Sequence, residues 1–147
     1  MEEIQRRAEA GSCPAQTLLG IAYLYGYEVE INYSAAFKFL SAAASQGASR
    51  AVLNLGVMHA KGLGIAQNLV EAVRLLEAVA RPSDSSDAFA ARMELGRLYS
   101  GLGTPTDSKK ALFWYEAAIT LSSGGEESAD IREARDYLAK RKTPNCS

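Results

Sequence analysis

The chain has 147 residues, of which 48% are hydrophobic and 22% are charged, and its formal net charge is −1. This composition is typical of a folded globular protein, and it offers no excess of basic residues for binding nucleic acid or an anionic membrane surface. No stretch approaches the roughly 18 apolar residues that a membrane span requires, and no apolar segment of a secretory signal stands at the start. We therefore expect a cytoplasmic protein whose partners exclude nucleic acid and membranes.

The first predicted element is a short helix within residues 1–14. Residues 4–10 followed by Gly11 align with residues 42–46 followed by Gly47. Since the later segment ends a full helical repeat, the match predicts that the N-terminal helix is either the remnant of a preceding repeat or a cap.

Three internal repeats follow this helix. The segments that begin at Ala15, Ala51 and Ala91 each contain a Leu-Gly pair and recur at intervals of 36 and 40 residues. Apolar residues at spacings of three and four predict a helix in each segment, and a Gly-bearing loop separates it from a second helix. We place repeat 1 at residues 15–50, repeat 2 at 51–90 and repeat 3 at 91–126.

Glycines mark two features of each repeat. The glycine of the Leu-Gly pair lies in the middle of the first helix, where glycine costs about 1 kcal/mol relative to Ala, so its recurrence predicts a close approach of the partner helix. These glycines are Gly20, Gly56 and Gly96. A later glycine is expected to end each first helix, namely Gly26, Gly62 and Gly101. Because repeat 3 is one residue shorter before that glycine, we expect its first helix to end early.

A final helix is predicted over residues 127–142, ahead of a tail at 143–147. Ile131, Ala134 and Leu138 share one face of this helix, and charged residues of both signs cover the rest. A polar outer face is what the terminal helix of an open stack requires. We interpret this helix as a C-terminal cap.

The repeats resemble a known family. Repeat 3 shows the pattern best, with a Leu-Gly pair, a Tyr, a Gly-x-Gly loop, a Lys-Ala pair, an aromatic pair and an Ala-Ala pair, at Leu95-Gly96, Tyr99, Gly101-Leu102-Gly103, Lys110-Ala111, Trp114-Tyr115 and Ala117-Ala118. This pattern is similar to that of the Sel-one-like repeats (SLR), a subclass of the tetratricopeptide-like proteins, and repeat 1 departs from it at Gly26-Tyr27-Glu28. The resemblance implies an all-α, right-handed α/α superhelical solenoid of three helix-turn-helix repeats with terminal capping helices. It also implies an adaptor or scaffold function.

The sequence offers no catalytic constellation. His59 is the one histidine, so it cannot form a multi-histidine metal site, and it stands where the other repeats have a tyrosine, which favours a packed role. The two cysteines, Cys13 and Cys146, lack a metal-ligand spacing. We expect a non-enzymatic protein with no catalytic residues, no metal and no cofactor.

The resemblance places the inner, concave face on the first helix of each repeat. Side chains at a fixed register on these helices are candidates for partner binding: Thr17, Ile21, Tyr25, Leu53, Val57, Lys61, Met93 and Arg97. The apolar members would form a stripe across three repeats, and the basic members would contact an acidic group of the partner. If so, Val57→Asp would abolish partner capture and leave the protein helical. The alternative is that the stripe is core between neighbouring helices.

These observations favour a protein-protein interaction module that holds an amphipathic helix or an extended peptide segment in its groove. Three alternatives stay open: a regulatory or immunity-type inhibitor of a cognate enzyme or toxin, a hydrolase, and a homodimer formed through the exposed end of the truncated first unit.

Overall fold

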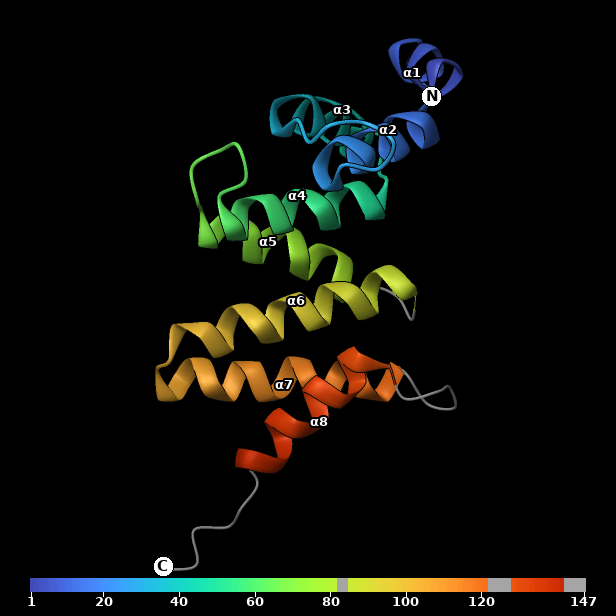
Figure 1. Cartoon of the computed structure of the whole chain (residues 1–147). Coiled ribbons are helices and arrows are strands. Elements are labelled where there is room, and N and C mark those ends of the chain that lie inside the picture. Colours follow the sequence, from blue (N-terminus) through green and yellow to red (C-terminus); the bar gives the residue numbers. More distant parts are fainter. Residues whose placement is uncertain (82–84, 122–127, 142–147) are drawn as a thin grey trace, which may run out of the picture. The chain divides into compact units, whose positions relative to one another are not determined.

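The computed structural model describes residues 1–81, 85–121 and 128–141. Within these residues the chain forms eight α-helices and no strand (Figure 1). The chain divides into two compact units, Met1–Val79 and Ala80–Ser147, called unit 1 and unit 2 below. The predicted tail at 143–147 and Cys146 lie outside the described residues.

Unit 1 consists of α1 to α5. Their bounds are Glu2–Glu9 for α1, Cys13–Tyr25 for α2, Tyr33–Ser45 for α3, Ser49–Lys61 for α4 and Leu69–Ala80 for α5, whose last residue belongs to unit 2. Helix α2 packs against α1 and α3, and α3 packs against α4. The first helices of the two repeats, α2 and α4, contact each other, and in Figure 1 α5 lies below α4.

The loops within repeats 1 and 2, between α2 and α3 and between α4 and α5, are closed in the same way. Gly26 and Gly62 end α2 and α4 in the left-handed conformation, as predicted. Asn32 and Asn68 then begin α3 and α5, and the side chain of each accepts a hydrogen bond from the backbone N–H three residues later, at 3.0 Å. The repeated turn chemistry explains why the two helix pairs have the same connection.

The close approach predicted at the mid-helix glycines is confirmed in unit 1. A Cβ atom on Gly20 would lie 2.6 Å from Cγ of Leu40, and one on Gly56 would lie 2.8 Å from Cγ of Leu76. Both leucines are fully buried. The missing side chains therefore let the second helix of each repeat seat a leucine directly on the backbone of the first.

Unit 2 consists of α6 (Ser86–Leu102), α7 (Pro105–Leu121) and α8 (Ala129–Arg141). Helix α7 packs against both α6 and α8. The expectation that Gly101 ends the first helix of repeat 3 early is wrong: α6 runs through Gly101 to Leu102, and Gly103 takes the left-handed φ of 78°. The shorter spacing puts Leu102 in register with Gly26 and Gly62, and because leucine disfavours positive φ, the helix ends at the next glycine.

Repeat 1 carries a strained residue in its loop. Glu28 has a φ of 61° and occupies the position of Gly64, the second glycine of the repeat 2 loop, whose φ is 70°. A side chain in this conformation costs about 1–2 kcal/mol, partly offset by the greater chain entropy that glycine loses on folding.

We therefore expect Glu28→Gly to raise the free energy of unfolding by about 0.5–1 kcal/mol, measured by urea denaturation. Glu30→Gly is the matched control, because Glu30 is an exposed acidic residue of the same loop without a positive φ. We expect the control to lower stability. Equal effects of the two substitutions would show that the strain at Glu28 has no energetic weight.

Candidate interaction surface

The predicted binding residues of α2 share one face of that helix. Thr17, Ile21 and Tyr25 follow one another at intervals of four residues. The Thr17 hydroxyl donates to the carbonyl of Cys13 in its own helix, and Ile21 is half-buried against the core of unit 1. The Tyr25 side chain is 45% exposed, which leaves its ring accessible at the end of the helix.

A buried asparagine that is not among the predicted binding residues holds Tyr25. The Tyr25 Oη donates to Oδ1 of Asn54 at 3.0 Å, and Nδ2 of Asn54 donates to the carbonyl of Arg50 at 2.8 Å. Asn54 is buried, so each of its hydrogen bonds replaces water that the side chain has lost. The signal in the sequence was the polar residue directly before the Leu-Gly pair of repeat 2, where repeat 1 has Leu18.

The predicted residues of α4 divide into two groups. Leu53 and Val57 are only 9% and 5% exposed, whereas Lys61 is exposed at the end of the helix. The apolar stripe was expected to be either an exposed binding surface or core between neighbouring helices. The low exposure of Leu53 and Val57 fits the core. The partner-binding role of these residues stays a prediction.

The predicted residues of unit 2 are both engaged within the chain. Met93 is fully buried. Arg97 pairs with Glu94 of its own helix at 2.9 Å and reaches α8, where its Nη2 lies 2.7 Å from Asp130 and 2.9 Å from Glu133. These hydrogen bonds, led by the one to Glu133, raise the pKa of Arg97 despite its partial burial. The acidic group predicted to meet Arg97 in a partner is therefore matched by the capping helix of the same chain.

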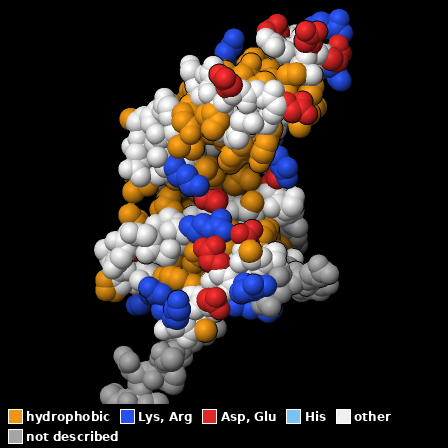
Figure 2. Space-filling view, in the orientation of Figure 1, with side chains coloured by type: hydrophobic (Ala, Val, Ile, Leu, Met, Phe, Trp, Pro, Cys, Tyr) orange, Lys and Arg blue, Asp and Glu red, His pale blue; other side chains and the backbone are white. Residues whose placement is uncertain are grey.

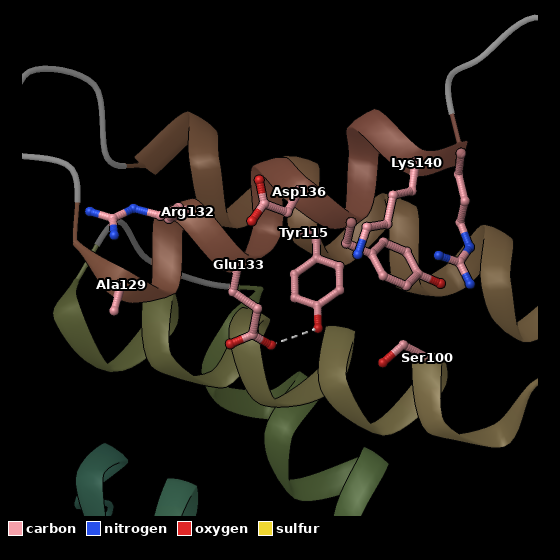
Figure 3. Close-up of a pocket in the computed structure, with 9 residues that line it drawn as sticks. Ser100, Tyr115, Ala129, Arg132, Glu133, Asp136 and Lys140 are labelled. Atoms are coloured by element: carbon pink, nitrogen blue, oxygen red, sulfur yellow. Dashed lines mark hydrogen bonds between the residues drawn. The ribbon is translucent and has the colours of Figure 1, made fainter.

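A cavity of about 530 Å³ lies between α8 and the two helices it covers (Figure 3). On its wall the Tyr115 Oη donates to Oε1 of Glu133 at 3.2 Å. Burial raises the pKa of Tyr115 to about 12, and the hydrogen bond from Arg97 lowers the pKa of Glu133. Besides Glu133, the lining includes charged side chains of both signs, from Arg132, Asp136, Lys140 and Arg141, so it does not present a single sign of charge to a ligand.

A patch of exposed apolar side chains surrounds Tyr25. Leu18 is 57% exposed and lies two turns before Tyr25 on the same face of α2. Tyr27 is 60% exposed, and its ring centroid lies 5.8 Å from that of Tyr25. Ile31 is exposed as well and lies against the Gly26 backbone. We call Leu18, Tyr25, Tyr27 and Ile31 the α2 patch. Figure 2 shows hydrophobic side chains gathered over this part of unit 1.

Other kinds of site find no support in the described part of the chain. Among residues 1–81, 85–121 and 128–141, no three His, Cys, Asp or Glu side chains come together in a way that could hold a metal ion. In the same residues no helix is both long enough and apolar enough to cross a membrane.

Comparisons with known proteins match the repeats. The family model of the Sel1 repeat matches residues 13–47, 49–81 and 90–123. A mouse protein, DAP3-binding cell death enhancer 1, is 36% identical over 77 residues, which cover 52% of this chain and 15% of the relative. The rat protein of the same name is 37% identical over 71 residues, 48% of this chain and 14% of the relative. The chain therefore spans only a small part of these relatives.

Two solved structures share the fold. The Sel1 repeat protein from Oxalobacter formigenes has a TM-score of 0.65 and 32% identity, covering 89% of this chain and 49% of that one. The protective antigen c5321 of uropathogenic Escherichia coli, which displays an SLR fold, has a TM-score of 0.67 and 30% identity, covering 85% of this chain and 26% of that one. These likenesses and the order of helix pairs confirm the predicted all-α, right-handed α/α solenoid class. Sel1 repeats are in general protein-interaction modules, and this chain belongs to the Sel1 repeat family.

Proposed function

We propose that the protein is a non-enzymatic, cytoplasmic interaction module that binds a segment of another protein on the α2 patch. The observation that carries this proposal is the half-exposed ring of Tyr25, which buried Asn54 holds in one orientation. A fixed aromatic ring loses little side-chain entropy when a partner covers it, and such rings dominate the binding energy of many interfaces.

The chemistry of the patch indicates the kind of segment that fits it. Leu18, Tyr25, Tyr27 and Ile31 present apolar surface, so the segment carries apolar side chains at the spacing of an amphipathic helix or an extended strand. Lys61, exposed at the end of the neighbouring helix α4, favours an acidic group on the segment. The mouse and rat relatives, named for binding DAP3, support a binding role in the wider family.

The test compares two exposed apolar residues of unit 1. We expect Leu18→Asp to weaken partner binding at least about tenfold, because it places a charge inside the apolar patch. Val70→Asp is the matched control: Val70 is 83% exposed and lies on α5, away from the patch residues in sequence. Both variants are expected to keep the helical circular dichroism signal of the wild type.

The readout is affinity capture from the lysate of the native host, followed by titration of the captured protein against the purified variants. Loss of the partner with Leu18→Asp and its retention with Val70→Asp would support the α2 patch. Equal capture by both variants would show that the partner binds elsewhere. Tyr25→Ser and Lys61→Glu, measured in the same titration, separate the contribution of the ring from that of the basic end.

A further inference from the structure

The second repeat lacks an aromatic pair that the other two repeats have. Tyr23 of repeat 1 and Tyr99 of repeat 3 lie three residues after the repeat glycine, where repeat 2 has His59. In each repeat, one side chain of the second helix packs on this glycine. The residue directly before that side chain is aromatic in repeats 1 and 3 and aliphatic in repeat 2. These residues are Phe39, Trp114 and Leu75.

In repeat 1 the aromatic pair fills the space between α1, α2 and α3. The rings of Tyr23 and Phe39 lie 6.3 Å apart at an angle of 10°, and Phe39 packs in a cluster with Ala8 and Leu19. In repeat 3, Tyr99 and Trp114 are both buried. Repeat 1 thus completes its packing at this place with two rings of its own, and both corresponding rings of repeat 3 are buried as well.

In repeat 2 the corresponding place is a hollow. A cavity of about 450 Å³ lies between α3, α4 and α5, and both His59 and Leu75 line it. Its apolar wall includes Val52, Leu55 and Phe37, whose ring meets the His59 ring edge-on at 6.3 Å. The Nδ1 atom of His59 is enclosed, and among the described residues it has no hydrogen-bond partner. The side chains of His59 and Leu75 are smaller than the two rings of repeat 1, and they leave space that repeat 1 fills.

The rim of this cavity is polar. Glu71 and Arg74 form an ion pair there, in which Nε of Arg74 donates to Oε2 of Glu71 at 2.9 Å. The hydrogen bond from Arg74 lowers the pKa of Glu71, so its carboxylate is ionised at neutral pH. A carboxylate has about four lone-pair sites, so Glu71 can accept a further hydrogen bond from a ligand.

We propose that the cavity between α3, α4 and α5 binds an aromatic ring that carries a hydrogen-bond donor, as the phenol of a tyrosine or the indole of a tryptophan does, supplied by a segment of a partner protein. The ring takes the place of the missing aromatic pair against Leu75 and Phe37, and its O–H or N–H faces the Glu71 carboxylate. A mostly apolar hollow with one ionised acceptor at its rim complements this chemistry.

This site is separate from the α2 patch and does not depend on it. Val52, Leu55 and His59 lie on one face of α4, at intervals of three and four residues. Asn54, which holds Tyr25, and Lys61 lie on the other side of the same helix. A partner on one face can therefore fail to bind while the other face is intact.

The experiment titrates the purified chain with p-cresol, the side-chain analogue of tyrosine, and follows backbone amide shifts by NMR. We expect saturable shifts at the residues lining the cavity and at least about fivefold weaker binding of toluene, which has the ring without the donor. Equal binding of toluene would overturn the assignment of the donor to Glu71. No saturable shift at the lining residues would overturn the site.

His59→Tyr provides the decisive variant, because it restores the residue that the other two repeats have at this position. Filling the hollow is expected to weaken p-cresol binding at least about tenfold and to raise the melting temperature. Leu75→Phe tests the same space from α5 if the first variant does not fold. Tyr27→Ser, a substitution in the α2 patch, is the control and should leave p-cresol binding unchanged. Undiminished binding to both filled variants would contradict the proposal.

Discussion

Val57→Asp is expected to unfold the part of the protein that contains α4. The Val57 side chain is 5% exposed, so the substitution removes buried apolar surface and places a carboxylate where water does not reach. We expect the free energy of unfolding to fall by at least about 4 kcal/mol, a large part of the stability of an ordinary domain. Circular dichroism during thermal and urea denaturation would show the loss of cooperative unfolding.

Two further substitutions in α4 serve as comparisons for Val57→Asp. Val57→Ala removes only part of the apolar side chain and is expected to cost about 1–3 kcal/mol. Lys61→Asp introduces the same carboxylate at an exposed position one turn later and should change stability by less than about 1 kcal/mol. A Val57→Asp protein that melts like the wild type would show that the side chain is accessible and would return it to the candidate binding surface.

Because Val57→Asp is expected to unfold the protein, it is not a suitable test of partner binding. Loss of a partner in Val57→Asp would follow from unfolding alone, so the substitution does not separate a groove from a core. Leu18 is exposed, and a substitution there changes the surface without entering the core. The binding test therefore rests on the α2 patch.

The repeat fold could be predicted because its signals are local. Gly20 and Gly56 recur at a fixed position of the first helix, although glycine has a low helix propensity. The close packing of Leu40 and Leu76 on these glycines explains why the loss of helix stability is tolerated. The end of α6 differs from the prediction at Gly101, because the shorter spacing puts Leu102 at the left-handed position and the helix continues to Gly103. A shift of one residue in the repeat register is therefore enough to move the end of the helix.

The candidate site was harder to predict than the fold. The core between repeats and a binding groove are lined by the same types of apolar residue at the same helical spacing. Val57 and Tyr25 therefore look alike in sequence, although Val57 is enclosed and Tyr25 is half-exposed. The pairing of Arg97 with Glu133 joins residues 36 positions apart, and only the packing of α8 reveals it. The cavity beside His59 follows from a comparison between repeats, but its size needed the structure.

A second large effect is expected in α6, where two glycines of one helix should respond to alanine in opposite directions. A Cβ atom on Gly96 would lie 2.7 Å from the Tyr115 ring, which is buried and held through its hydroxyl by Glu133. The ring cannot move away without breaking that hydrogen bond, so overpacking outweighs the better helix propensity of alanine. We expect Gly96→Ala to lower the free energy of unfolding by about 1–2 kcal/mol.

Gly101 is the matched control because it lies within the same helix and an added Cβ would meet nothing within 4 Å. Alanine there gains helix propensity without a clash, so Gly101→Ala is expected to raise stability by up to about 1 kcal/mol. Urea denaturation of the two variants beside the wild type measures both values. Stabilisation by both substitutions would mean that α7 can shift away from α6, and the recurrent glycine would then need an explanation other than close packing.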